Sequence, residues 1–119
     1  MKNLAPWISI PALDFKRAVE FYNRVLEIEL QVVDCGEEKM ACFPSGEGAV
    51  SLTPGFKPSQ DGVLVSLNVG ADLDATMDRV EQNGGKIVQP KTKIEAEGRG
   101  YFSLFIDCEG NKLGLYSDN

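Results

Sequence analysis

Apolar residues follow strand spacing and then helical spacing at the start of the chain. The segment Ile8-Ser9-Ile10 alternates apolar and polar positions and ends at Pro11, which is typical of a short strand. From Phe15 to Leu26, apolar residues recur every three or four positions with charged residues between them. Asp14 precedes this run and can cap free backbone amides. The pattern predicts a strand and then an amphipathic helix over about residues 14–27.

The same order then repeats. Turn-forming residues separate three short apolar runs that we interpret as strands, at residues 28–33, 39–43 and 49–53. A linker at about 54–62 leads to a second alternating run at 63–69, and Asp72 caps a second helix that Gly84-Gly85 ends. Further strands are expected near residues 86–89, 101–106 and 112–116.

These elements predict an α+β fold with two tandem βαβββ modules, at about 1–53 and 63–117 within a single domain of residues 1–119. One module covers a single face of its small sheet with a helix. We therefore expect the two modules to form a curved mixed sheet around a cleft, where a small molecule binds.

Composition excludes several classes of partner. A chain of 119 residues with 43% apolar and 25% charged residues is typical of one folded domain. Its net charge of −6 and scattered basic residues argue against nucleic acid binding. No apolar run is long enough to span a bilayer, and the start of the chain lacks the apolar core of a signal peptide. We therefore expect a cytoplasmic protein without membrane contact.

The three cysteines do not form a recognisable metal or disulfide pattern. Cys35, Cys42 and Cys108 are odd in number and include no C-x-x-C pair, so we interpret them as small, partly buried side chains.

Several short motifs together resemble the vicinal oxygen chelate superfamily, which contains glyoxalases, bleomycin-resistance proteins and extradiol dioxygenases. The most specific is the hairpin from Asp107 to Tyr116, which is similar to the D-P-x-G-N turn and final strand of that superfamily, with Cys108 in place of the proline. The other motifs are Trp7 to Asp14, Arg17-Ala18 with Phe21-Tyr22, Asp72 to Thr76, and Lys91-Thr92. The resemblance covers nearly the whole chain and implies the cleft architecture above.

The resemblance also implies where metal ligands would stand. Metal-dependent members place two histidines and two acidic residues in the cleft, around a divalent ion that stabilises an enediolate-like charge. The matching positions here hold Trp7, Ser51, Gly114 and either Val65 or Ser66, of which we prefer Ser66 because Val65 belongs to the apolar alternation. The chain has no histidine. We expect no metal ion and no cofactor, and a site made only of carboxylates is the remaining metal alternative.

The residues that would line the cleft are suited to an organic ligand. Alternation away from the expected core selects aromatic, hydroxyl and amide side chains, which are Trp7, Ser9, Ser51, Thr53, Ser66, Asn68, Gly114 and Tyr116. The alternative for Trp7 and Tyr116 is packing between modules or across a dimer. The charged loop 91–100 is either a lid or a surface hairpin, and Tyr101 at its exit is the one phenol placed to transfer a proton beside it.

Three functions follow from these observations. The first is a metal-independent small-molecule-binding protein of the glyoxalase and bleomycin-resistance type. The second is a lyase, isomerase or dioxygenase related to lactoylglutathione lyase, although no catalytic residue is identified. The third is a non-catalytic interaction subunit. For each we expect a homodimer, because an open sheet face with Trp7 and Tyr116 would otherwise expose apolar area.

Overall fold

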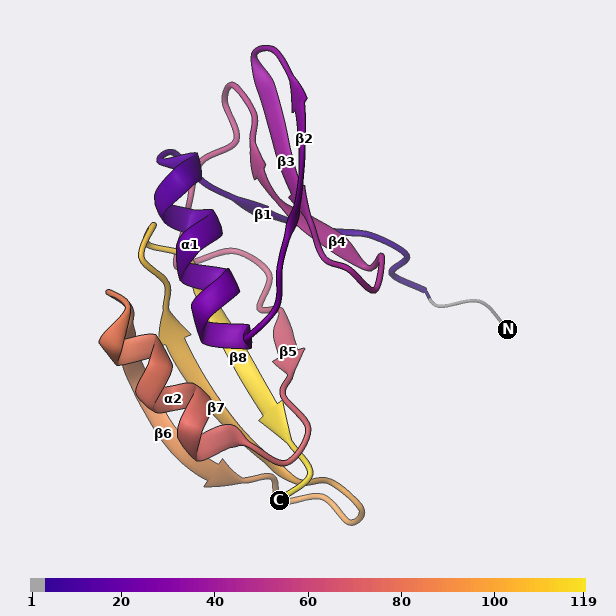
Figure 1. Ribbon diagram of the computed structural model, residues 1–119. Helices are drawn as coiled ribbons and strands as arrows, with labels where there is room; N and C mark the ends of the chain where they lie inside the picture. Colours follow the sequence, from indigo (N-terminus) through magenta and orange to yellow (C-terminus); the bar gives the residue numbers. More distant parts are fainter. Residues whose placement is uncertain (1–3) are drawn as a thin grey trace. The chain divides into compact units, whose positions relative to one another are not determined.

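The computed structural model describes residues 4–119, which form two compact units that divide between Pro58 and Ser59. Each unit has one strand, one helix and three further strands (Figure 1). The first contains β1 (Ile8–Pro11), α1 (Phe15–Leu26), β2 (Gln31–Cys35), β3 (Glu38–Cys42) and β4 (Gly48–Leu52). The second contains β5 (Ser66–Asn68), α2 (Leu73–Gln82), β6 (Lys86–Lys93), β7 (Tyr101–Ile106) and β8 (Lys112–Ser117). The predicted α+β fold with two tandem βαβββ modules is confirmed.

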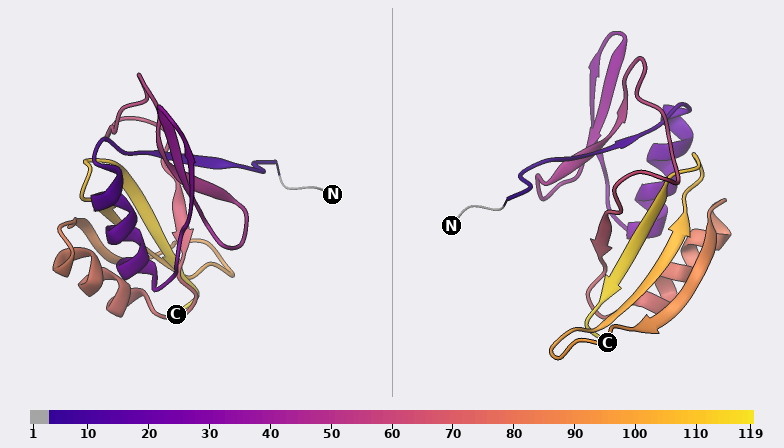
Figure 2. Two further views of the ribbon diagram at one scale, coloured as in Figure 1. Left: turned by 45° about the horizontal axis from the view of Figure 1, so that its top comes forward. Right: turned by 180° about the vertical axis from the view of Figure 1, so that it is seen from behind.

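Both units use the same strand order. The first sheet is ordered β1-β4-β3-β2 and the second β5-β8-β7-β6, as Figure 2 shows from two further sides. In each sheet the first and last strands of the unit pair in parallel, and the other neighbours are antiparallel. The parallel pair brings the first strand of each unit beside its last strand, so residues about 40 to 50 positions apart become direct neighbours.

The first helix begins and ends as its sequence dictates. The Asp14 carboxylate accepts a hydrogen bond from the Arg17 amide at 3.2 Å, which satisfies one of the free donors at the helix start. Its apolar stripe is buried, namely Ala18, Phe21, Tyr22 and Val25. The helix ends at Glu27, whose left-handed backbone (φ 54°) lets its amide donate to the Asn23 carbonyl. Residues 28–30 complete this end, since the Leu30 amide donates to the Asn23 side chain at 2.8 Å. The following strand therefore begins at Gln31 rather than at Ile28.

The second helix begins differently from expectation. Asp72 occupies the N-cap position, but its side chain makes no capping hydrogen bond, so that part of the prediction is wrong. The carboxylate lies 3.9 Å from the Arg79 guanidinium, and the Asp72 carbonyl accepts from the Thr76 hydroxyl instead. Gly84 (φ 97°) ends the helix as predicted. The helix contacts β6, β7 and β8 and covers one face of the second sheet (Figure 1).

Two strands differ in length from the predicted ranges. β5 spans three residues, although apolar alternation runs from 63 to 69: Ser66 to Asn68 are in register with β8, and the flanking Val65 and Val69 each share one backbone hydrogen bond with it. Val63 lies outside the strand and is 92% exposed. β6 extends to Lys93, so the expected loop shortens to a turn at 94–100, where the Ile94 amide donates to the Gly100 carbonyl at 3.0 Å. Within residues 4–119, neither helix has the length and apolar character needed to cross a bilayer.

Candidate functional site

The face of the second sheet opposite α2 gathers four of the predicted site residues. β5 and β8 pair so that Ser66 lies opposite Gly114 and Asn68 lies opposite Tyr116. Paired residues point to the same side of a sheet, so these four share one face. We call this face, with its β7 neighbours described below, the second-sheet face.

The other side of the same strands forms the core of the unit. Leu113 and Leu115 alternate with Gly114 and Tyr116 along β8 and are buried, as is Phe105 of β7. The Ser103 hydroxyl is buried there as well and donates to the Gln89 carbonyl at 2.8 Å. Successive residues of β8 therefore point in turn to the core and to the opposite face, and Leu113 and Leu115 are core residues as the sequence predicted.

Two apolar residues of the second-sheet face were not predicted. The β7 register places Phe102 opposite Tyr116 and Leu104 opposite Gly114, so both extend the face. The segment Tyr-Phe-Ser-Leu-Phe-Ile of β7 carries large aromatic or apolar residues on both sides, so alternation does not assign its faces. Its antiparallel pairing with β8, anchored on the predicted hairpin at Asp107 to Asn111, was the signal that could have found them.

The polar groups of the second-sheet face are partly engaged. The Asn68 carbonyl oxygen accepts from the Gly70 amide at 2.9 Å, which leaves the amino group of that side chain as a donor. The Tyr116 hydroxyl donates to Asp118 at 3.1 Å. Ser66 is exposed, and its hydroxyl makes no hydrogen bond within the described part of the chain. The face therefore combines aromatic surface with a hydroxyl and an amide that can bind a ligand oxygen.

Tyr101 lies on the other side of this sheet. It pairs with Ser117 and Lys93, and Ser117 is adjacent to Tyr116 along β8, so the two tyrosines point to opposite faces. The ammonium groups of Lys91 and Lys93 lie 4.8 Å and 5.5 Å from the centre of the Tyr101 ring. Lys91 also lies 3.5 Å from the Asp74 carboxylate of α2. Tyr101 thus has cation–π partners on the helix side and is separated from the second-sheet face.

The remaining predicted residues belong to the first unit. Trp7 precedes β1 and is 47% exposed, and its indole N–H donates to the Ser9 hydroxyl at 3.1 Å. Ser9 lies opposite Ala49, and Ser51 lies two positions further along β4, opposite Pro11. Thr53 follows the end of β4, where its carbonyl accepts from the Phe56 amide.

Two sulfur-containing residues share that face of the first sheet. Met40 lies opposite Ser51, and Cys42 lies opposite Ala49, so both point to the same side as Ser9. We call Trp7, Ser9, Met40, Cys42 and Ser51 the first-sheet face. The sequence predicted the strand that carries Met40 and Cys42 but gave no pairing register for it, so their position was missed.

The family of the chain is shown by a match over most of its length. Residues 5–115 match the model of the Glyoxalase/Bleomycin resistance protein/Dioxygenase superfamily. The chain belongs to this superfamily. No functionally curated protein matches the sequence.

Solved structures with low sequence identity share the fold. A glyoxalase/bleomycin resistance protein from Albidiferax ferrireducens is 17% identical, with a TM-score of 0.74 over 97% of this chain and 98% of the other. An antibiotic-binding protein from a Streptomyces species is 20% identical, with a TM-score of 0.66 over 99% and 98% of the two chains. Glyoxalase I from Zea mays is 16% identical, with a TM-score of 0.66, and this chain covers 45% of its length.

The residues at the superfamily's metal positions do not fit a divalent ion. Ser66 and Gly114 are direct partners on neighbouring strands, but they offer only a hydroxyl and no side chain. In the first unit, Ser51 lies opposite Pro11 and not opposite Trp7, so these two positions are not neighbours. Residues 4–119 contain no group of three or more His, Cys, Asp or Glu side chains arranged to hold a metal.

The Ser66 side chain also fills the space that a side chain at 114 would need. A Cβ built on Gly114 would lie 2.5 Å from the Ser66 hydroxyl oxygen and 3.3 Å from the Ser66 Cβ. A glutamate at 114 would therefore require Ser66 to move. At the position that the resemblance assigns to a metal ligand, Gly114 therefore lacks a donor, and Ser66 leaves no room for one.

The hairpin turn that carries the family resemblance has a structural role. The buried Asp107 carboxylate accepts hydrogen bonds from the amides of Glu109 and Asn111, both at 2.9 Å, and from the Asn111 carboxamide at 3.0 Å. The Asn111 side-chain oxygen accepts from the Ser59 amide at 3.2 Å, and the Lys112 amide donates to the Ser59 carbonyl. The turn therefore fixes both the start of β8 and the end of the linker.

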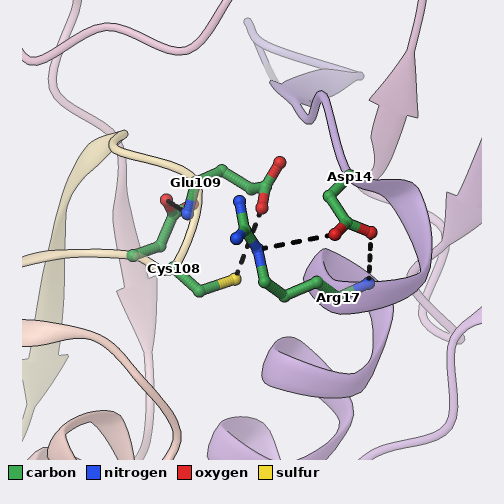
Figure 3. Close-up of polar contacts among 5 residues, drawn as sticks. Asp14, Arg17, Cys108 and Glu109 are labelled. Atoms are coloured by element: carbon green, nitrogen blue, oxygen red, sulfur yellow. Dashed lines mark hydrogen bonds and ion pairs between the residues drawn. The ribbon is translucent and has the colours of Figure 1, made fainter.

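Figure 3 shows the polar contacts of this turn and of the α1 start. The Cys108 thiol lies 3.9 Å from the Glu109 carboxylate in the turn, and the Arg17 guanidinium lies 4.0 Å from Asp14 at the helix. Cys108 is partly buried and Cys35 is exposed, and no disulfide joins any of the three cysteines, all of which lie in the described part of the chain. Each of these contacts joins residues that are close in sequence and belong to one unit. Neither contact brings a nucleophile or a base to the second-sheet face.

Proposed function

We propose that this chain binds a small organic molecule without a metal ion, and that the second-sheet face is its principal binding surface. The observation that carries the proposal is the Ser66–Gly114 pair. Its hydroxyl has no partner in the described part of the chain and lies at the position that the resemblance assigns to a metal donor, and Leu104, Phe102 and Tyr116 lie on the same face. Binding surfaces for organic ligands have this composition, with few polar groups on a mainly apolar floor.

The chemistry of the face favours a flat ligand with oxygen acceptors. Phe102 and Tyr116 lie opposite each other on neighbouring strands, so both rings are on this face and can stack on a flat ligand. The Ser66 hydroxyl and the Asn68 amino group lie beside it and can donate to carbonyl or hydroxyl oxygens of the ligand. On the first-sheet face, Trp7 can offer its ring to a ligand but not its indole N–H, which already donates to the Ser9 hydroxyl.

The antibiotic-binding relative supports this class of ligand. Its fold matches nearly the whole of both chains, and it is a binding protein. We propose that the present chain likewise sequesters or senses an organic compound. We also propose that it forms a homodimer, because Trp7 and several other large apolar side chains are exposed.

Two tyrosines allow a matched test of the binding surface. A panel of aromatic, cationic and dicarbonyl metabolites would be titrated into ¹⁵N-labelled protein. At least one compound is expected to shift the amides of Ser66, Asn68 and Tyr116 saturably. Tyr116→Ala should weaken that binding by about 1 to 3 kcal/mol through lost ring contact, whereas Tyr101→Ala, on the other face, should not change it.

The same titration can contradict the proposal. Saturable shifts confined to α2 and the helix side of the sheet would place the ligand elsewhere. Loss of binding with Tyr101→Ala but not with Tyr116→Ala would also refute the assigned face. The single tryptophan gives an independent signal, since a ligand that contacts Trp7 should change its fluorescence and lose that response in Trp7→Phe.

A further inference from the structure

Two polar residues of β6 lie beside the second-sheet face. β6 pairs with β7 so that Gln89 is opposite Leu104 and Thr92 is opposite Phe102. Two rows of residues therefore cross the four neighbouring strands β5, β8, β7 and β6 on one side of the sheet (Figure 1). The first row is Ser66, Gly114, Leu104 and Gln89, and the second is Asn68, Tyr116, Phe102 and Thr92. We call Gln89 and Thr92 the β6 edge, and Ser66 and Asn68 the β5 edge.

A bulge in β6 places both residues of the β6 edge on that side. Gln89 and Thr92 are three positions apart, so strict alternation would point them to opposite sides. Their partners Leu104 and Phe102 are two positions apart, and the register of β6 shifts before and after Gln89. The extra residue brings both side chains to one side. Their contact agrees with this placement, since the Gln89 carboxamide donates to the Thr92 hydroxyl at 3.2 Å.

The Thr92 hydroxyl determines which way the Gln89 carboxamide points. This hydroxyl has one hydrogen, which it donates to the Pro90 carbonyl at 2.8 Å, so toward Gln89 it can only accept. The amino group of Gln89 must therefore face Thr92, and its side-chain oxygen points elsewhere. Among residues 4–119, that oxygen accepts no hydrogen bond. The β6 edge thus presents an acceptor in a fixed orientation.

The β5 edge presents donors instead. The Ser66 hydroxyl has a hydrogen to donate, and the Asn68 amino group is available because the side-chain oxygen of Asn68 already accepts from the Gly70 amide. The residues between the two edges are aromatic, apolar or glycine. Three strand spacings separate β5 from β6, so the main chains of the two edges lie about 14 Å apart. Two linked aromatic rings with a polar group at each end span a distance of this order.

We infer that the site takes an elongated, flat ligand with two different ends, an oxygen acceptor at the β5 edge and a hydrogen-bond donor at the β6 edge. The inference rests on the function proposed above and adds the orientation and chemical class of the ligand. Gln89 is the specificity-determining residue, and Thr92 is the positioning residue that holds the Gln89 carboxamide. A ligand with an acceptor at both ends would leave the Gln89 oxygen facing another oxygen, which lowers affinity.

Three biphenyls that differ at one end test this polarity. The probes are 4-acetyl-4′-hydroxybiphenyl, 4,4′-diacetylbiphenyl and 4-acetylbiphenyl, each titrated into ¹⁵N-labelled protein. The first should shift the amides of Ser66, Gln89 and Tyr116 saturably and should bind about tenfold more tightly than the diacetyl compound. Gln89→Lys replaces the acceptor with a donor, so it should reverse this preference.

A variant of the positioning residue separates orientation from mere support of the strand. Thr92→Val frees the Gln89 carboxamide to turn, so the preference should fall to about twofold. Affinity for 4-acetylbiphenyl, which has no polar group at the β6 edge, should stay unchanged. The control is Gln31→Leu on β2 of the first unit, which should alter neither the preference nor the affinities. Equal weakening of all three probes by Thr92→Val would overturn its positioning role.

The remaining outcomes distinguish failure of this inference from failure of the proposed function. If all three probes shifted Ser66 and Tyr116 with equal affinity, or if Gln89→Lys left the preference unchanged, the polarity would be wrong and the binding surface would stand. If no biphenyl shifted these amides up to its solubility limit, the inferred ligand class would be wrong. The proposed function would fail with it only if the metabolite panel also produced no shift on the second-sheet face.

Discussion

Two glycines occupy matching places in the two units, and they are required for different reasons. Gly48 and Gly114 each lie on the last strand of their sheet, opposite a residue of the first strand, which is Ile8 for Gly48 and Ser66 for Gly114. A Cβ at 48 would collide with the main-chain carbonyl group of Ile8, whereas a Cβ at 114 would first meet the Ser66 hydroxyl, at 2.5 Å. A side chain at 48 is thus excluded by the main chain of the neighbouring strand, whereas a side chain at 114 is excluded by the Ser66 side chain.

The difference shows which of the two positions can change without changing the fold. A backbone collision at 48 cannot be relieved by substitution of Ile8, because every residue has the same main chain. The contact at 114 depends on the serine at 66 and can be removed. We infer that the superfamily's metal position in the second sheet is closed by an exchangeable pair of residues, whereas the parallel strand pair of the first sheet is fixed.

The largest expected effect is at Gly48. Gly48→Ala should lower the free energy of unfolding by about 3 kcal/mol or more, because β1 and β4 must separate to admit the methyl group. Gly62→Ala is the control, since no atom lies within 4 Å of its added Cβ and its backbone is not left-handed. Urea denaturation should place that control within about 0.5 kcal/mol of wild type. A Gly48→Ala protein as stable as the control would remove the distinction between the two glycines.

The second prediction concerns the turn that sets the register of β8 and so places Gly114 opposite Ser66. Asp107→Ala should cost about 2 to 4 kcal/mol, because it leaves three hydrogen-bond donors of the turn without their buried carboxylate. Asp34→Ala is the matched control in the first unit. Asp34 also begins a hairpin turn and accepts from the Gly36 amide at 2.9 Å, but it is exposed. Its loss should cost less than about 1 kcal/mol. If urea denaturation gave equal losses of unfolding free energy for the two variants, burial of the Asp107 carboxylate would add nothing to stability.

The sequence predicted the fold well because local signals agreed with the tertiary structure. The apolar stripe of α1 and the oxygen of Asp14 each determine part of that helix by themselves. Strand length was less predictable, because hydrogen bonding depends on the partner: the alternation at 63–69 exceeds β5, whose partners on β8 begin at Gly114. Sequence could not distinguish Asp72 from Asp14, since each precedes a helix and lies near an arginine of that helix, yet only Asp14 makes the capping hydrogen bond.

The candidate site was predicted where one face of a strand is polar and the other apolar. Alternation selected Ser66, Asn68, Gly114 and Tyr116, and the register of β5 with β8 brings these four onto one face, while their role in binding stays a prediction. Phe102 and Leu104 were missed because β7 carries large aromatic or apolar residues on both sides. Tyr101 was selected because its phenol could transfer a proton. It pairs with Ser117, one residue after Tyr116, so it points to the face opposite Tyr116.

The third prediction tests whether Gly114 depends on Ser66. Gly114→Ala should cost about 1 kcal/mol, since Ser66 can rotate but must lose its present position. In Ser66→Ala the closer contact is absent, so the same substitution at 114 should cost less, with a coupling energy of about 0.5 to 1 kcal/mol in the double-mutant cycle. Additive losses from thermal or urea unfolding would show that the backbone, and not Ser66, sets the limit at 114.

The smallest expected effect is that of metal ions on the wild-type protein. Because Ser66 and Gly114 supply no strong donor, excess Zn²⁺ or Ni²⁺ should shift the melting temperature by less than about 1 °C, and elemental analysis should find substoichiometric metal. The double variant Ser66→His/Gly114→Glu shows whether the assay can detect binding. It places an imidazole and a carboxylate on directly opposed positions of β5 and β8, so its melting temperature should rise by about 2 °C or more with Zn²⁺. Gly114→Glu alone should respond less, because it supplies only one donor. One metal ion per chain in untreated wild-type protein would contradict the comparison, since it would mean that donors outside these two positions hold the ion.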